Sequence, residues 1–166
     1  MIELRAVEPE DVEFMFECEA DPQAARWSDY SAPMSRQQLL DYALSYDANP
    51  FSAGQLRLIA VNNEGQRIGI LDLYDISQRD CKAYVGITIH PEFRGKGYSR
   101  KCLYALESFS FSRLGIKSLI AKISKANTIV NNLFVACGYT IVAILPKWHK
   151  IGPEFHDFNI FVKYSN

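Results

Sequence analysis

Residues 85–99 constrain the fold of this chain more than any other part of its sequence. Residues 85–89 form an apolar run typical of a buried strand, and a proline and two glycines, Gly95 and Gly97, follow it. From residue 97 to 114 the apolar residues recur at helical spacing. This order of strand, glycine loop and helix predicts an anion site, because the first helical turn has unpaired N–H groups and glycine lets a phosphate approach them.

Basic side chains surround the same loop. Arg94 and Lys96 alternate with the glycines, and Arg100 and Lys101 fall in the first turn of the helix that follows. Cations are disfavoured at a helix N-terminus, so their presence favours a bound anion that compensates for them. The alternative is a tight turn in which the glycines serve geometry alone and the basic side chains are solvated.

The rest of the chain predicts one domain over residues 1–166, of the α/β (α+β) class, with a mixed sheet and helices in both halves. Strands are expected at 2–6, 56–61, 68–73, 83–89, 118–123, 139–145 and 155–164. Helices are expected from Pro9, from Ser35, at 97–114 and at 127–137. The stretch 21–33 is too irregular for a regular element, and Asn49–Pro50 is expected to end the second helix.

Composition excludes several classes of protein. With 18 Lys and Arg against 19 Asp and Glu, the net charge is −1, which gives no general attraction to nucleic acid or to an anionic membrane. No apolar run has the length of a signal peptide or a membrane span, so a cytoplasmic protein is expected. The four cysteines are far apart and lack metal-ligand spacing, so they are interpreted as reduced core thiols and no metal site is expected.

Two stretches carry a resemblance to a known family. Residues 86–99 resemble the signature of the GNAT superfamily of acyl-CoA-dependent N-acyltransferases, which is a strand, a proline turn and then Arg/Gln-x-x-Gly-x-Gly/Ala. Arg94 and Gly97 match this pattern, and Ser99 stands where a small residue is usual. Residues 127–139 are similar to the family's helix that begins with Asn and ends in Gly-Phe. The chain most resembles the subgroup that contains ribosomal-protein alanine and spermidine N-acetyltransferases.

The resemblance implies a fold and a co-substrate. The fold is a mixed, largely antiparallel central sheet of about seven strands flanked by about four helices. The co-substrate is acetyl-CoA, and no metal is implied. Its pantetheine arm is expected to pair with the main chain of Ile87, Thr88 and Ile89, and Asn127 is expected to bind this arm from the other side. The residues expected to hold the pyrophosphate are Arg94, Gly95, Lys96, Gly97, Tyr98 and Ser99.

Two positions depart from the family pattern. Where many members have a Tyr that protonates the thiolate, this chain has Phe134, which packs against the cofactor but donates no proton. The thiolate then leaves toward water, another hydroxyl serves, or the protein is a non-catalytic acyl-CoA sensor. Where the spermidine-type pattern often has Glu, this chain has Tyr84, which either relays a proton through water or is simply a strand former.

The acceptor side is less defined by the sequence. Asp72 and Tyr74 end a strand and are candidates for binding a cationic amine, with solvated strand-end residues as the alternative. Trp27 and Tyr30 either wall an acceptor pocket or cap the core. The resulting interpretation is transfer of an acetyl group to a small-molecule or peptide primary amine by direct attack in a ternary complex. Polyamine, protein N-terminus, aminoglycoside and amino acid all remain open as acceptors, and so does a homodimer.

Overall fold

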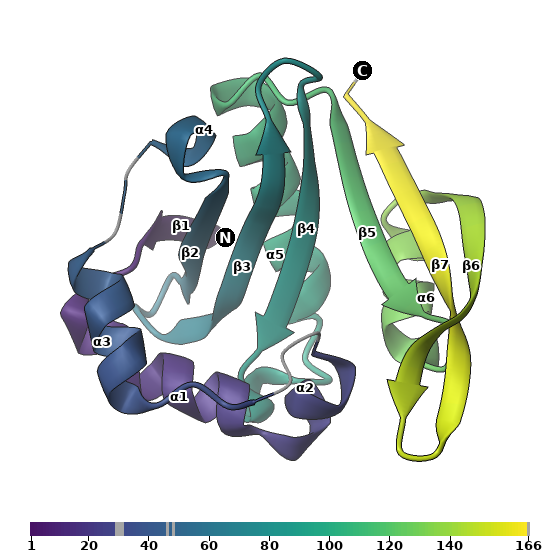
Figure 1. Cartoon of the computed structure of the whole chain (residues 1–166). Helices are drawn as coiled ribbons and strands as arrows, with labels where there is room; N and C mark the ends of the chain where they lie inside the picture. The colour runs from purple at the N-terminus through teal and green to yellow at the C-terminus, as the bar shows by residue number, and fades with distance from the viewer. Residues whose placement is uncertain (29–31, 46, 48, 166) are drawn as a thin grey trace.

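A seven-stranded sheet forms the centre of the computed structural model, which describes residues 1–28, 32–45, 47 and 49–165 (Figure 1). The strands are β1 (Ile2–Ala6), β2 (Gln55–Asn62), β3 (Arg67–Ser77), β4 (Lys82–Ile89), β5 (Ser118–Ser124), β6 (Thr140–Ile151) and β7 (Glu154–Tyr164). Their order is β1-β2-β3-β4-β5-β7-β6. Neighbouring strands are antiparallel except for β4 and β5, which are parallel.

Helices cover both faces of this sheet (Figure 1). Within the described ranges they are α1 (Val12–Ala20), α2 (Pro22–Trp27), α3 (Arg36–Leu44), α4 (Pro50–Ala53), α5 (Tyr98–Ser108) and α6 (Thr128–Ala136). Helices α1 and α3 pack on one face, against Ile59 and Ile70. Helix α5 packs on the other face, because its buried residues Cys102, Leu103 and Leu106 fall on one side at helical spacing.

The predicted fold class and sheet are confirmed, but the number of helices differs from the prediction of about four. The two additional helices, α2 and α4, are short and begin at Pro22 and Pro50, directly after Asp21 and Asn49. In both, the Asp or Asn side chain accepts a hydrogen bond from the first turn and proline occupies the first helical position. Helix α2 buries none of its residues, so it has no apolar periodicity to reveal it, and the expectation that 21–33 lacks a regular element was wrong.

A buried carboxylate ties the beginning of the chain to the sheet. Asp11, fully buried, accepts two hydrogen bonds of 2.7 Å from Arg5 of β1 and one of 3.3 Å from Arg67 of β3. The backbone N–H of Glu8 donates another at 2.9 Å. Burial acts to raise the pKa of the Asp11 carboxyl, but Arg5, Glu8 and Arg67 together outweigh it and hold the pKa below its ordinary value.

The substitution Asp11→Asn is therefore expected to lower the free energy of unfolding at pH 7 by about 1–3 kcal/mol, as measured by urea denaturation. Because the folded-state pKa is depressed, this stabilisation is present above the unfolded pKa of about 3.9 and is lost as the pH falls through the folded pKa. The gap between wild type and variant should close in acid. The exposed neighbour provides a control, since Glu10→Gln should change stability by less than about 0.5 kcal/mol. Equal effects of the two substitutions would contradict the role given to Asp11.

Candidate functional site

The middle of the sheet is open where β4 and β5 part (Figure 1). Their parallel pairing runs only from Lys82 opposite Ser118 to Tyr84 opposite Ile120. Beyond these pairs β4 stays bonded to β3, and β5 stays bonded to β7. Within the described residues, each of the two strands therefore has one edge with no strand beside it. The open edge of β4 includes Ile87, Thr88 and Ile89, whose main chain the sequence assigned to the pantetheine arm.

At the end of β4 a glycine loop leads into α5. Gly95 and Gly97 have φ angles of +71° and +77°, in the left-handed region that glycine adopts without strain. A side chain built at either position would meet no atom within 4 Å, so the backbone conformation and not crowding requires glycine here. Among the described residues no side chain caps the N-terminus of α5. The turn thus leaves N–H groups and open space together, which is the arrangement that anion-binding turns use.

The Arg94 side chain contacts both the end of β4 and the beginning of α2. Its Nη1 lies 2.8 Å from Oδ2 of Asp21, and its Nε donates to the carbonyl of Ile89 at 2.9 Å. Its backbone N–H donates to Pro91 O at 3.3 Å. The side chain thus joins the loop to the end of β4 and the beginning of α2, because the Asp21 carboxylate and the Ile89 carbonyl both take its donors. We therefore correct the expectation that the Arg94 side chain adds positive charge beside the loop amides.

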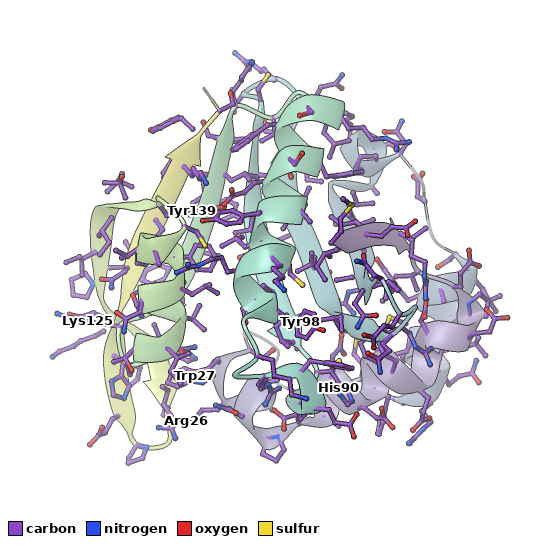
Figure 2. The ribbon with its side chains drawn as sticks, turned by 180° about the vertical axis from the view of Figure 1, so that it is seen from behind. Arg26, Trp27, His90, Tyr98, Lys125 and Tyr139 are labelled. Atoms are coloured by element: carbon purple, nitrogen blue, oxygen red, sulfur yellow. The ribbon has the colours of Figure 1, made fainter. Side chains whose placement is uncertain are left out.

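The other predicted loop residues lie around the start of α5, where Figure 2 shows Tyr98 near His90. The Tyr98 ring packs edge-on against Phe93, with 5.7 Å between ring centroids. The Lys96 ammonium lies 5.6 Å from the centroid of the Phe93 ring. Lys96 is exposed and Ser99 is half-buried. These residues leave a cationic and aromatic rim beside the N–H groups of the loop.

The opposite lip of the opening is the junction of β5 and α6. Asn127 begins α6, and its Oδ1 accepts from the N–H of Val130 at 3.3 Å. Asn131 Nδ2 donates to Ser124 O at 2.8 Å and to Asn127 O at 2.7 Å. Asn159 of β7 in turn donates to Asn131 Oδ1 at 2.7 Å. The sequence identified Asn127 but not Asn131 and Asn159, which hold the junction in place from positions distant in the chain.

Phe134 is almost completely buried, with 1% of its surface exposed. Its ring packs edge-on against Tyr139, with 4.7 Å between centroids, and lies 6.0 Å from Phe161. Tyr139 lies between α5 and the C-terminal end of α6 (Figure 2), with its hydroxyl buried. Burial, and the nearby carboxylate of Glu107, raise the pKa of this phenol above its ordinary value. Because the Tyr139 hydroxyl is buried from solvent, it is a poor substitute for the family's tyrosine.

The face of the sheet that α1 covers contains the predicted acceptor residue Asp72. Its carboxylate binds Arg57 through contacts of 2.8 and 3.1 Å, and Arg57 also binds Glu19 of α1. Burial acts to lower the pKa of Arg57, but Asp72 and Glu19 outweigh it and raise the pKa, so the guanidinium stays protonated. Asp72 is thus one of two carboxylates that share a single cation.

Tyr74 and Tyr84 stack beside this ion-pair cluster, with 5.5 Å between ring centroids. The ammonium of Lys122 lies 5.1 Å from the Tyr84 centroid and 5.7 Å from that of Tyr74. Sequence reasoning missed Lys122. The available signal was its place as a lone cation in an otherwise apolar strand, on the face opposite to the buried Ala121 and Ile123.

Trp27 lies at the lower end of the opening, opposite the β6–β7 hairpin (Figure 2). Its ring centroid is 6.4 Å from that of His149 on β6, and His149 is 5.1 Å from Phe158 on β7. Helix α2 therefore meets the hairpin across the gap between the two halves of the sheet. Tyr30, the other aromatic residue predicted to wall an acceptor pocket, lies outside the described residues.

A surface depression of about 710 Å³ lies between α1 and residues 90–92. Its lining includes Glu13, Glu17 and Glu92, and also Arg36, which forms an ion pair with Glu13. In the described part of the chain, no group of three His, Cys, Asp or Glu side chains is arranged to hold a metal ion. No helix among the same residues is long and apolar enough to cross a bilayer.

An open edge on a parallel strand pair, leading to a glycine turn at a helix N-terminus, is an arrangement suited to an extended ligand with a phosphate at one end. The chain belongs to the GNAT acetyltransferase family, because the family profile described as "Acetyltransferase (GNAT) domain" matches residues 2–140. It is therefore an acetyl-CoA-dependent N-acetyltransferase, as the sequence motifs predicted.

Individual relatives are distant but match along almost the whole chain. Spermidine N(1)-acetyltransferase of Escherichia coli K12 is 22% identical over 165 residues, which cover 99% of this chain and 82% of the relative. The uncharacterized N-acetyltransferase YoaA of Bacillus subtilis is 21% identical over 159 residues, or 95% and 90% of the two chains. The crystal structure of spermidine N-acetyltransferase from Vibrio cholerae with CoA and spermine superposes with a TM-score of 0.89 at 21% identity, covering 98% and 95%. The structural similarity establishes the shared fold.

If the loop holds the pyrophosphate, the substitution Gly97→Glu should weaken acetyl-CoA binding at least tenfold in a calorimetric titration, since it puts a like charge beside the phosphates. Gly54→Glu is a matched control. Gly54 has a φ of +69° and no atom within 4 Å of the place a Cβ would take, so both substitutions carry a similar strain of about 1–2 kcal/mol. Gly54 ends α4, far from the loop, and its variant should bind normally. Equal loss in both variants would trace the effect to backbone strain and not to charge beside the phosphates, and normal binding by Gly97→Glu would place the ligand elsewhere.

Proposed function

We propose that this protein acetylates a small-molecule or peptide primary amine, which attacks the acetyl group directly in a ternary complex. The observation that carries this proposal is the parting of β4 and β5 above a glycine turn. Such an opening gives an extended cofactor access to the middle of the sheet, and it leaves the opposite face for the acceptor. Within this class, the acceptor is the property that distinguishes one enzyme from another.

The residues at the opening fit acetyl-CoA. The unpaired main chain of Ile87, Thr88 and Ile89 can form β-type hydrogen bonds with the amides of the pantetheine arm. The N–H groups around Gly95 and Gly97 face open space at a helix N-terminus and suit the pyrophosphate. Asn127 is the N-cap of α6, and its Oδ1 accepts a hydrogen bond from the first turn. Its Nδ2 is left to donate to the pantetheine arm. Acetyl-CoA supplies the activated acetyl group as a thioester.

Two protons must move during transfer, one from the amine and one to the departing thiol. Tyr84 lies where the strands part and faces the acceptor side together with Tyr74. We assign it the relay of the ammonium proton to water. Phe134 has no proton to give, and the hydroxyl of Tyr139 is buried in the core, out of reach of a departing thiolate. Water is left as the proton source, and Phe134 serves to pack the α6 side of the opening.

The direct test incubates the purified protein with acetyl-CoA and a panel of primary amines and identifies N-acetylated products by mass spectrometry. The panel should include spermidine, aminoglycosides, amino acids and peptides with a free N-terminus. The expected result is product formation with at least one class, which Gly97→Glu abolishes and Gly54→Glu preserves. Tight acetyl-CoA binding without any product would favour instead a non-catalytic acyl-CoA sensor, the alternative that Phe134 raises.

The substitution Phe134→Tyr restores the hydroxyl that many family members carry. It should raise kcat by roughly tenfold or more, because general acid catalysis contributes about 10²–10⁴-fold in enzymes that use it. Tyr139→Phe removes the neighbouring hydroxyl and should leave kcat unchanged. A drop in kcat for Tyr139→Phe would show that Tyr139 is the acid after all. The kcat values should be compared at equal folded fraction, since burying a new hydroxyl costs about 1–3 kcal/mol where it finds no partner.

A further inference from the structure

We propose that the acceptor amine carries an anionic group, such as a carboxylate, and that Lys122 and Asp72 recognise its two opposite charges across the parting of β4 and β5. This inference rests on the proposed function and narrows it to one class of acceptor. It assigns Lys122 as a specificity-determining residue.

Lys122 lies where the two strands separate. The last residue of β5 that pairs with β4 is Ile120, and Lys122 is the next residue whose side chain points to the same face of the sheet. Its ammonium reaches back across the gap to the rings of Tyr84 on β4 and Tyr74 on β3. The charge is thus held over the acceptor face, on a side chain that is only half-exposed.

The stacked tyrosine rings orient this cation without neutralising it. Ring faces attract an ammonium but leave its formal charge and its hydrogen-bond donors available. Among the described residues, no carboxylate forms an ion pair with Lys122. An anionic ligand group would satisfy these donors, whereas a second ammonium in the same place would be repelled.

The complementary negative charge comes from Asp72 of β3, on the same face of the sheet. Asp72 pairs in register with Gly86 of β4, and it shares the cation of Arg57 with Glu19, so the three groups carry one net negative charge. Gly86 places no side chain between Asp72 and the open edge of β4. A side chain built at Gly86 would approach Asp72 Cβ to 3.3 Å and Asp72 Oδ2 to 3.8 Å. Gly86 therefore does not cover the Asp72 side chain, which remains 28% exposed, and the ammonium of an incoming amine can approach its carboxylate.

The two charges have consequences for the choice of acceptor. A short zwitterion places its ammonium beside Asp72 and its carboxylate beside Lys122, and both contacts are favourable. A polyamine such as spermidine brings only positive charge, so the segment that reaches Lys122 is repelled. The charge pattern thus favours an amino-acid-like acceptor over a polycation.

The test measures kcat/KM for acetylation of glycine, β-alanine and γ-aminobutyrate, of the amide of each, and of spermidine. Each value is corrected for the fraction of acceptor present as free amine. For wild type we expect at least one carboxylate to have a kcat/KM about tenfold above that of its amide and above that of spermidine. In Lys122→Gln this ratio should fall to about one, through KM. Lys122→Arg should keep the ratio because it keeps the charge. Lys125→Gln is the matched control, since Lys125 is exposed on the adjoining loop, and it should behave as wild type.

A second measurement does not depend on turnover. Titration of the preferred carboxylate into the protein with CoA present should give a Kd about tenfold higher for Lys122→Gln than for Lys125→Gln. A wild type that prefers spermidine, or shows no preference for any carboxylate over its amide, overturns the inference. An equal loss of kcat for charged and neutral acceptors in Lys122→Gln also overturns it, because it would place Lys122 at the reacting acetyl group. Failure to bind acetyl-CoA would instead contradict the proposed function itself.

Discussion

Main-chain groups in the middle of a sheet normally pair on both edges, and β4 and β5 depart from this beyond Tyr84 and Ile120. A buried backbone group without a partner costs about 1–3 kcal/mol, so a parting at the centre of a sheet must be supported elsewhere. Here each half of the sheet keeps its own strand pairing although the hydrogen bonds between β4 and β5 are absent beyond this point. Strand β4 stays bonded to β3 as far as Ile89, and β5 stays bonded to β7 as far as Ser124. The open edges are then available to a ligand that has amides along an extended chain.

Several contacts around the opening join the elements that border it. Arg94 fastens the glycine loop to the end of β4 and to Asp21, which begins α2. Helix α2 then meets the β6–β7 hairpin through Trp27 and His149, while Asn131 fixes the junction of β5 and α6. Loop, helix and hairpin are therefore parts of one frame. A change in any of them would alter the width of the opening as well as the local structure.

The alternation of side chains along the strands separates two chemical tasks. Residues such as Val85, Leu119 and Ala121 point toward α5 and build the larger core. The residues between them, Tyr84, Gly86 and Lys122, point to the opposite face, where Asp72 and Arg57 also lie. The proposed phosphate site is thus built from main chain and glycine, which tolerate little change. The proposed acceptor face is built from side chains that can vary without disturbing the sheet.

The sequence by itself determined the order of elements, the glycine loop with its helix and the Asn127 helix start. These features depend on residues within a few positions of one another: an apolar run, glycines where φ must be positive, and a capping side chain. Only the tertiary structure decided the partner of Arg94, the sharing of Arg57 by Asp72 and Glu19, and the position of Lys122 over two tyrosine rings. Each of these joins side chains from elements distant in the chain. The position of Lys122 depends on the point at which β4 and β5 part. That point is set by pairing between strands distant in the sequence, so no local pattern encodes it.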